Sequence, residues 1–380
     1  MTDTSRPPLS LYIHVPWCVR KCPYCDFNSH ALTGDLPEGA YRHALLEDLQ
    51  EDLGGVDNRP IDTVFIGGGT PSLMSADFYH CLFDGLREHL TLAPDAEITL
   101  EANPGTLEQG RFRGFREAGI NRLSIGVQSF QASHLEVLGR IHDADAARRA
   151  MDEARAAGFE RFNVDLMHGL PDQTVNDAIA DLHTAMAHEP PHISWYQLTL
   201  EPNTAFYSAP PRLPDEETLA AIADAGAETL SGSGYRPYEV SAWSRDGDIA
   251  RHNLNYWQFG DYLALGAGAH GKITFPNGDI RRYWKTRQPE AYLNRLGSRT
   301  AGQSTIEPSE RPLEFLMNAL RLTDGVEEAL FEARTGVPLS SIQDELTALR
   351  QEGLLTPDRL QTTPMGQRYL DSILQRFLGD

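Results

Sequence analysis

Short apolar runs alternate with amphipathic stretches through the first half of the chain. Tyr41, Leu45, Leu49 and Leu53 recur every four residues and predict a helix. Val175, Ile179, Leu182 and Met186 form a second stripe of this kind. The runs between such stripes predict six strands, at Leu9–Val15, Asp62–Ile66, Glu97–Ala102, Arg122–Val127, Phe162–Met167 and Ile193–Leu200. This alternation indicates a parallel sheet with helices outside it and right-handed crossovers.

The pattern changes from about Pro202 onward. A helix is expected from Leu219 to Leu230, ending at Gly232–Gly234, followed by an aromatic-rich loop and the small-residue run 265–271. Residues 308–380 read as a small helical unit with a turn at Pro357, and this unit resembles a winged helix. We therefore expect three segments, at 1–205, 206–307 and 308–380.

Charge and composition exclude several classes of protein. The 380 residues carry 33 Lys and Arg against 54 Asp and Glu, a formal net charge of −21. General nucleic-acid binding depends on cations that neutralise phosphates, so we expect no nucleic-acid partner. No apolar run approaches the roughly 20 residues that span a membrane. The first eight residues lack the apolar core of a signal peptide, so we expect a cytoplasmic protein.

Three of the four cysteines lie within eight residues, at Cys18, Cys22 and Cys25. Thiolates bind iron–sulfur clusters or zinc. Three cysteines on a [4Fe–4S] cluster would leave one iron open for a small molecule. A structural zinc site would need a fourth ligand, and the nearest candidates are His14, Asp26 and His30. The sequence alone leaves both alternatives open, whereas a disulfide does not suit a reducing compartment.

The spacing C-x3-C-x2-C, with an aromatic residue before the last cysteine, resembles the radical S-adenosyl-L-methionine (SAM) superfamily. The run 12–18, followed by Cys-Pro-Tyr-Cys-Asp-Phe, is similar to the oxygen-independent coproporphyrinogen III dehydrogenases and the related HemW heme chaperones. The resemblance implies an α/β fold: an open, partial (β/α)6 barrel with a C-terminal α+β extension and a winged-helix-like unit. It implies a [4Fe–4S] cluster on Cys18, Cys22 and Cys25, with the methionyl group of SAM on the fourth iron.

Several polar residues and glycines fall at the ends of predicted strands, where the site of such a barrel lies. Gly67–Gly69 follow a strand directly, and Glu101 ends the next one. Without the resemblance, the glycine run is also typical of a tight turn between a strand and a helix. Glu101 is likewise also typical of a solvated carboxylate at a strand end. With it, the residues implied to contact SAM are Tyr12, Tyr24, Gly68, Gly69, Thr70, Glu101, Gln128, Arg140 and Asp165.

The run His252-Asn253-Leu254-Asn255-Tyr256-Trp257 is the second candidate site. His and Tyr are both axial ligands of heme iron, and Trp offers a flat apolar face to a macrocycle. An isolated histidine among aromatic residues is also commonly structural. The motif resembles one that is characteristic of the HemW family, which implies heme binding. His252 is the first candidate ligand, Tyr256 is the alternative, and Trp257 is a candidate wall.

Two departures separate this chain from the dehydrogenases. They carry a further cysteine where this chain has Phe27, and a longer segment before the position of Tyr12. We therefore expect a heme chaperone that keeps a SAM-coordinated [4Fe–4S] cluster and delivers heme to an unidentified acceptor protein. The alternative is a radical SAM enzyme that oxidatively decarboxylates coproporphyrinogen III to protoporphyrinogen IX. The sequence leaves open whether the chain is an enzyme and whether it is a monomer or a homodimer.

Overall fold

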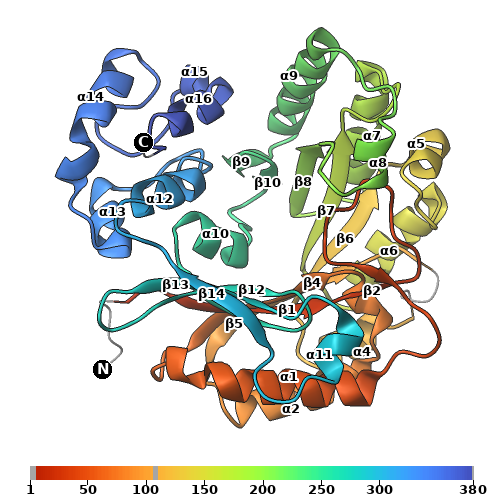
Figure 1. The fold of residues 1–380 in the computed structure, drawn as a ribbon. Coiled ribbons are helices and arrows are strands. Elements are labelled where there is room, and N and C mark those ends of the chain that lie inside the picture. The colour runs from red at the N-terminus through yellow and green to blue at the C-terminus, as the bar shows by residue number, and fades with distance from the viewer. Residues whose placement is uncertain (1–5, 106–109, 379–380) are drawn as a thin grey trace.

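The computed structural model describes residues 6–105 and 110–378, which are built around one large sheet (Figure 1). Its twelve strands run in the order β14-β13-β12-β11-β1-β4-β5-β6-β7-β8-β10-β9. The six strands from β1 to β8 in this order are mutually parallel. They are β1 (Leu9–Val15), β4 (Ile61–Gly68), β5 (Leu92–Ala102), β6 (Arg122–Gln128), β7 (Arg161–His168) and β8 (His192–Gln197).

All six predicted strands are present, and the predicted bounds of β1 are those observed. β5 begins five residues before the predicted Glu97. β8 ends at Gln197, three residues before the predicted end, where Leu198 N–H turns to the carbonyl of His168. These strands are buried on both faces, as parallel strands covered by helices are. Their continuous apolar runs made them recognisable from sequence.

Helices cover the outer face of the parallel strands, with α1, α2 and α4 along one side (Figure 1). The predicted stripe from Tyr41 forms α1 and buries Tyr41, Leu45 and Leu49, whereas Leu53 starts a short 3-10 turn. The helices of this part are α1 (Glu38–Asp52), α2 (Ala76–Arg87), α4 (Phe112–Glu117), α5 (Ala132–Val137), α6 (Ala144–Ala156), α7 (Val175–Ala187), α8 (Ala205–Ser208) and α9 (Glu216–Gly232).

The barrel stays open, as the fold prediction required, because β1 and β8 do not pair with each other. Instead β1 pairs with β11 in parallel, and β8 pairs with β10 in an antiparallel manner. The extension adds six strands and two helices, most of which the sequence analysis left unassigned. They are β9 (Arg236–Glu239), β10 (Ala242–Ser244), α10 (Arg251–Trp257), β11 (Asp261–Leu265), β12 (His270–Thr274), β13 (Ile280–Lys285), α11 (Pro289–Leu293) and β14 (Thr300–Thr305). The three-segment division of the chain stays a prediction.

The C-terminal unit packs around an apolar core that includes Phe315, Phe331 and Leu349 and extends to Phe259 and Ile280 of the preceding segment. Leu355 pairs with Thr362 across the predicted turn, as in the wing of a winged helix. This unit also touches both ends of the sheet: Leu322 pairs with Glu239 of β9, and Glu314 forms an ion pair with Arg282 of β13. Its helices are α12 (Arg311–Ala319), α13 (Glu328–Thr335), α14 (Gln343–Gln351), α15 (Pro364–Arg368) and α16 (Leu370–Gln375).

Two small elements complete the architecture. β2 (Trp17–Cys18) pairs in parallel with β3 (His30–Ala31), and these two strands enclose the cysteine loop. Three 3-10 turns lie at Leu53–Gly55, Pro71–Leu73 and Leu339–Ile342. In the described ranges 6–105 and 110–378, no helix has the length and apolar character needed to cross a membrane.

The packing of α9 on β8 gives a direct test of this fold. A Cβ atom added at Gly226 of α9 would lie 1.8 Å from the Trp195 ring, so Gly226→Ala must displace the indole. We expect this substitution to lower the free energy of unfolding by about 1–3 kcal/mol. Gly232→Ala, in the same helix with no atom within 4 Å of the added carbon, is the matched control. Urea denaturation of both variants measures the difference, and equal stabilities would contradict the packing described.

Candidate functional site

The three clustered cysteines line one cavity of about 270 Å³ at the carboxyl ends of the parallel strands. Cys18 is 9% exposed and ends β2, while Cys22 and Cys25 are half-buried in the loop that follows. A hydrogen bond of 3.2 Å from Cys25 N–H to the Cys22 carbonyl closes the turn between them. All three are free thiols, and burial raises the pKa of Cys18 and Cys25. Cys81 is exposed on α2 and does not line this cavity.

The glycines after β4 position the cysteine loop. Gly69 N–H donates to the Val15 carbonyl and Thr70 N–H donates to the Trp17 carbonyl, each at 2.7 Å. A Cβ atom at Gly69 would lie 2.6 Å from the Trp17 oxygen, and Gly68 adopts a φ of +114°. Only glycine allows both the approach and this conformation without strain. The sequence suggested glycines for a close approach to a ligand, and the structure shows a close approach to the protein's own backbone.

None of the three candidate fourth ligands lines the cysteine cavity. His14 hydrogen-bonds to Tyr12 and to the Asn28 carbonyl, His30 hydrogen-bonds to the Asn28 side chain, and Asp26 faces a neighbouring cavity. In the part of the chain that the structure describes, no three His, Cys, Asp or Glu side chains converge as ligands of one metal ion. Three cysteines that each bind a different iron of a cluster do not need to converge. The donor set therefore suits a cluster with one open iron.

Eight of the nine predicted SAM residues line the same cavity as the cysteines: Tyr24, Gly68, Gly69, Thr70, Glu101, Gln128, Arg140 and Asp165. Tyr12 does not line it and lies in the neighbouring cavity. Residues from six separate segments of the chain thus line one cavity. Their assignment to SAM stays a prediction, because the geometry shows where these residues lie and no more.

The two carboxylates of this cavity are electrostatically unusual. Burial, together with the nearby Asp165 carboxylate, raises the pKa of Glu101 to about 8. The hydrogen bond that Gly68 N–H donates to Glu101 at 3.1 Å lowers this pKa and so opposes part of the rise. Burial also raises the pKa of Asp165, although Ser124 and Asn163 donate to it at 2.9 and 2.7 Å. Glu101 therefore keeps its proton near neutral pH in the absence of a cation. A ligand with an ammonium group would favour its ionisation.

Arg140 lies at the cysteine side of the same cavity. Its Nη2 donates to Asn103 at 2.6 Å and to the Gly126 carbonyl at 2.7 Å, and its Nη1 approaches Cys22 Sγ at 3.7 Å. Its buried Nε has no hydrogen-bond partner among the described residues. A ligand carboxylate that pairs with both Nη atoms of Arg140 would have to compete with Asn103 and Gly126.

Sequence reasoning missed several residues that line the cavity, among them Asn103, Ser124, Gly126 and Tyr196. The Tyr196 hydroxyl donates to Gln128 Oε1 at 2.8 Å, and Gln128 adopts a φ of +69°, which is costly for a residue other than glycine. The available signal for Asn103 was its position directly after the predicted strand Glu97–Ala102, whereas Tyr196 lies inside the predicted strand Ile193–Leu200. Their uncharged side chains drew no attention.

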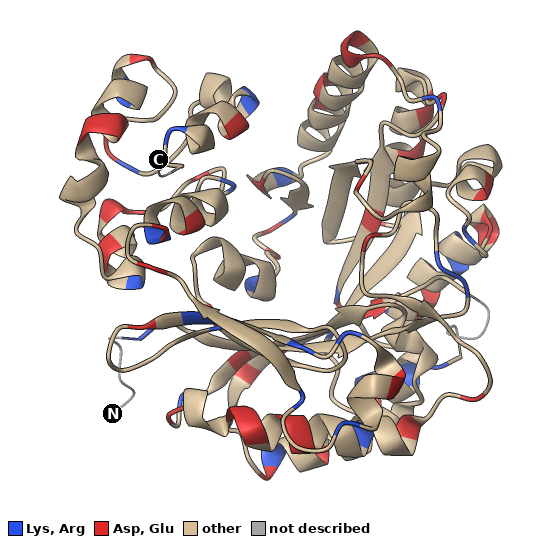
Figure 2. Cartoon of the chain, viewed as in Figure 1, with Lys and Arg blue, Asp and Glu red and all other residues tan. Residues whose placement is uncertain are grey.

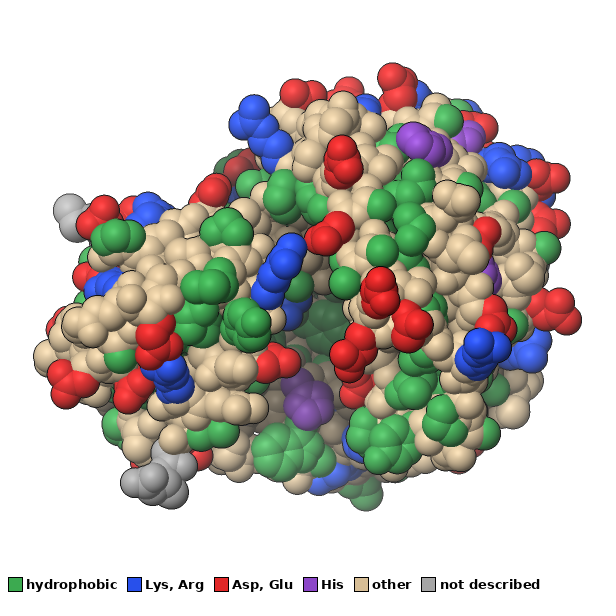
Figure 3. All heavy atoms as spheres, turned by 90° about the horizontal axis from the view of Figure 1, so that it is seen from above, with side chains coloured by type: hydrophobic (Ala, Val, Ile, Leu, Met, Phe, Trp, Pro, Cys, Tyr) green, Lys and Arg blue, Asp and Glu red, His purple; other side chains and the backbone are tan. Residues whose placement is uncertain are grey.

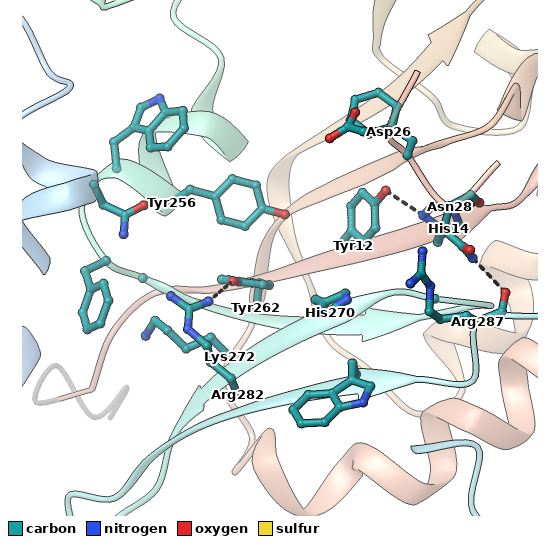
Figure 4. Close-up of a pocket in the computed structure, with 17 residues that line it drawn as sticks. Tyr12, His14, Asp26, Asn28, Tyr256, Tyr262, His270, Lys272, Arg282 and Arg287 are labelled. Carbon is teal, nitrogen blue, oxygen red and sulfur yellow. Dashed lines mark hydrogen bonds between the residues drawn. The ribbon is translucent and has the colours of Figure 1, made fainter. Parts of the chain in front are cut away.

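A second cavity of about 790 Å³ adjoins the first (Figure 4). Aromatic and cationic side chains dominate its lining, and it is open to solvent where the molecule is hollowed beside the C-terminal unit (Figure 3). The predicted residues Tyr256 and Trp257 line it, and so do Tyr262, His270 and Trp284 from β11, β12 and β13. Sequence reasoning missed these last three because their strands were not recognised.

His252 does not line this cavity, so the structure does not support it as the first candidate ligand. It is 1% exposed, and both ring nitrogens are already hydrogen-bonded: Nδ1 to Thr63 Oγ1 at 2.6 Å and Nε2 to the Tyr256 hydroxyl at 2.8 Å. Burial lowers the pKa of His252 to about 3, so the ring is neutral. His252 instead holds Tyr256, which points from α10 into the cavity toward Tyr12 (Figure 4).

Three cations line the second cavity, while acidic side chains are spread over outer helices such as α1, α9 and α14 (Figure 2). Lys272 is buried and paired with Asp261 at 3.0 Å. Arg282 forms an ion pair with Glu314 and donates to the Tyr262 hydroxyl at 3.1 Å. Arg287 is exposed, and its guanidinium has no ion pair or hydrogen bond within the described ranges. Arg287 is therefore available for an anionic group.

Comparisons with known proteins agree with this arrangement. Residues 12–185 match the family model of the radical SAM superfamily, and residues 306–369 match that of the HemN C-terminal domain. A heme chaperone HemW of Escherichia coli is 50% identical over 376 residues, which cover 98% of this chain and 99% of the relative. The chain belongs to the HemW family. A second HemW, from Haemophilus influenzae, is 48% identical over 380 residues and covers the same shares of the two chains.

The HemW family lies within the radical SAM superfamily, and membership of that superfamily implies a [4Fe–4S] cluster and SAM. The solved coproporphyrinogen III oxidase HemN of Escherichia coli matches with a TM-score of 0.83 at 23% identity, covering 98% of this chain and 90% of that one. At this identity the likeness shows a shared fold. The same fold thus carries a protein named as an oxidase and relatives named as heme chaperones.

Glu101 should make stability depend on pH. Between its usual pKa of 4.5 and about 8, the folded protein retains a proton that the unfolded chain has lost. The free energy of unfolding should therefore fall as pH rises through this window, by at most roughly 5 kcal/mol from this residue. Glu101→Gln should remove that fall, and Glu160→Gln, at an exposed site, should retain it. Urea denaturation of the ligand-free proteins at several pH values measures this, and parallel curves for all three would contradict it.

Proposed function

We propose that this protein is a heme chaperone, which binds heme in the aromatic cavity and transfers it to an acceptor protein. The observation that carries the proposal is a large aromatic cavity, with a buried histidine–tyrosine pair at its wall, directly beside the cysteine cavity. Relatives named heme chaperone HemW that match nearly the whole chain support it. The acceptor is a protein whose identity the chain does not specify.

Tyr256 is the proposed axial ligand of the heme iron. Its hydroxyl oxygen forms a hydrogen bond of 2.8 Å with His252 Nε2, and the Thr63 hydroxyl fixes the opposite nitrogen of that ring. A phenol oxygen is an established ligand of ferric heme. The neutral imidazole can donate its Nε2–H to the Tyr256 oxygen, and this hydrogen bond stabilises the phenolate form of the ligand. His252 is therefore a positioning residue that acts through Tyr256, which reverses the order expected from the sequence.

The remaining walls suit a flat, dianionic macrocycle. Trp257 and Trp284 offer apolar aromatic surface, and Arg321 of the C-terminal unit lies 4.4 Å from the centre of the Trp257 ring and fixes its face. Arg287 supplies an unpaired guanidinium for a propionate, which it can bind through two parallel hydrogen bonds. Heme therefore finds a ligand, two aromatic walls and a cation in one cavity.

Cys18, Cys22 and Cys25 are proposed to hold the [4Fe–4S] cluster, with SAM in the rest of their cavity. A bound cluster supplies one-electron chemistry. Glu101 is placed to accept from the SAM ammonium group and Arg140 to meet its carboxylate. Asp165 is placed for the ribose hydroxyls and Gln128 for the adenosine part. The loop closed by Gly69 and Thr70 keeps the thiols at the strand ends.

A divided sample tests the proposed function against porphyrinogen decarboxylation. After anaerobic cluster reconstitution, one half is titrated with ferric heme and followed by absorbance. The other half receives SAM, reductant and coproporphyrinogen III. Stoichiometric heme binding without a protoporphyrinogen product supports the chaperone. Turnover to protoporphyrinogen, or failure to bind heme, overturns it.

Tyr256→Phe should weaken heme binding strongly, because it removes the ligand oxygen and leaves the ring in place. His252→Gln should weaken binding less, since an amide can still hydrogen-bond the Tyr256 hydroxyl. The charge-transfer absorption of ferric phenolate should disappear in Tyr256→Phe and only shift in His252→Gln. Tyr207→Phe, at an exposed tyrosine outside the cavity, is the matched control. An unchanged spectrum in Tyr256→Phe would exclude Tyr256 as the ligand.

Cys22→Ala should lose the cluster, because one coordinating thiolate is missing, yet it should still bind heme in the separate aromatic cavity. Iron and sulfide analysis measures the first effect and heme titration measures the second. Cys81→Ala, at the exposed cysteine on α2, should retain the full cluster content. Cluster iron at the unsubstituted level in Cys22→Ala would contradict the cluster assignment.

A further inference from the structure

The two cavities share a wall that is one side chain thick. Phe27, which is 59% exposed, lines both of them. On one side of it Cys25 lines the cysteine cavity, and on the other side Asp26 and Asn28 line the aromatic cavity. Cys25 and Phe27 are two residues apart, a span of at most about 7 Å along the chain. A cluster ligand and a wall of the heme cavity are therefore almost adjacent.

A second part of the wall lies deeper, where His14 packs on Gly68. A Cβ atom at Gly68 would lie 2.5 Å from His14 Cε1, so ring and backbone are in tight contact. Gly68 lines the cysteine cavity, and His14 lines the aromatic cavity with Tyr12, whose hydroxyl is 3.0 Å from His14 Nδ1. His14 belongs to β1 and Gly68 to β4, so the paired ends of these two strands form the wall at this point.

Electrostatic interactions across this wall affect the pKa values of side chains in the aromatic cavity, which agrees with the geometry. Burial is the main cause of the raised pKa of Tyr12, and the Glu101 carboxylate of the cysteine cavity adds to it. Burial is likewise the main cause for Tyr256, with smaller contributions from Tyr262, Tyr12 and Glu101. A charge in one cavity thus acts on the proposed heme ligand in the other.

We infer that a cluster held by the three cysteines passes one electron through the wall of Phe27, His14 and Tyr12 to ferric heme at Tyr256. The inference rests on the proposed function and adds a redox activity to it. The reduced cluster loses one electron and returns to its oxidised state, while the heme iron gains that electron and becomes ferrous. No bond of SAM is broken. An external one-electron donor of low potential restores the reduced cluster.

The ligand chemistry gives this electron a use. A phenolate carries a full negative charge, which stabilises the ferric iron more than the ferrous iron because the metal charge falls by one. Reduction therefore weakens the bond between Tyr256 and the iron without any change in the protein's walls. The electron would loosen the heme at the moment at which it can be passed to an acceptor.

The test uses a protein whose only electrons are on its cluster. The reconstituted, SAM-free protein is reduced with photoreduced deazaflavin, freed of reductant by anaerobic gel filtration, and mixed with ferric heme in a stopped-flow spectrometer. We expect one ferrous heme per reduced cluster, with loss of the electron paramagnetic resonance signal of the cluster on the same timescale. Cys22→Ala, treated identically, should bind ferric heme and leave it oxidised.

Phe27→Ala should slow the transfer roughly tenfold, equivalent to about 1.4 kcal/mol of activation free energy. Phe27→Trp, which restores an aromatic wall, should retain the original rate. Leu296→Ala, at a side chain that is 97% exposed and lines neither cavity, is the matched control. An equal slowing in Leu296→Ala, or none in Phe27→Ala, would overturn the role of the wall.

The failure of the inference and the failure of the proposed function give different results. A cluster signal that persists beside bound ferric heme overturns electron transfer and leaves the chaperone intact. Absence of heme binding in the unsubstituted protein overturns the proposed function itself. Ferrous heme formed equally in Cys22→Ala would show that the electron does not come from the cluster, which also overturns the inference.

Discussion

The close approach between the end of β4 and the chain that leaves β1 determines where both cavities lie. Gly69 and Thr70 donate to the carbonyls of Val15 and Trp17, so the segment before Cys18 is fixed against a neighbouring parallel strand. The cysteine loop consequently starts at the strand ends, where Glu101 and Asp165 also point. The same contact presses His14 against Gly68 and separates the two spaces. A side chain larger than hydrogen at Gly69 would push the loop away from the strands.

Sequence reasoning succeeded where the determining interactions are local. Buried parallel strands give continuous apolar runs, and three cysteines within eight residues lie close together in any fold. It did not anticipate which of His252 and Tyr256 faces the aromatic cavity, because the two stand four residues apart and so share one face of α10. Their order along the chain says nothing of which one meets solvent. Thr63 of β4 and Glu97 of β5 decide this by hydrogen-bonding to His252, and both come from strands far away in sequence.

The extension was unreadable for a related reason. β12 has five residues and β13 has six, and in neither do buried and exposed positions alternate as they do in a strand with one solvent-facing side. Their pairing is imposed by the sheet to which they add. This is why the residues of the cysteine cavity were largely anticipated, whereas His270, Arg282 and Trp284 of the aromatic cavity were not. A local motif can be recognised from the sequence, whereas a cavity built from short strands near the end of the sheet cannot.

The C-terminal unit holds the two ends of an open sheet, through Leu322 at β9 and Glu314 at β13. Strand pairing within an open sheet does not specify the distance between the two sides of that sheet. Here the C-terminal unit contacts both β9 and β13, and it therefore fixes the distance between these two sides of the open sheet. Arg321 extends this role, since it pairs with Glu239 and also rests on Trp257. Another protein that binds to this unit and shifts it would therefore change the distance between β9 and β13.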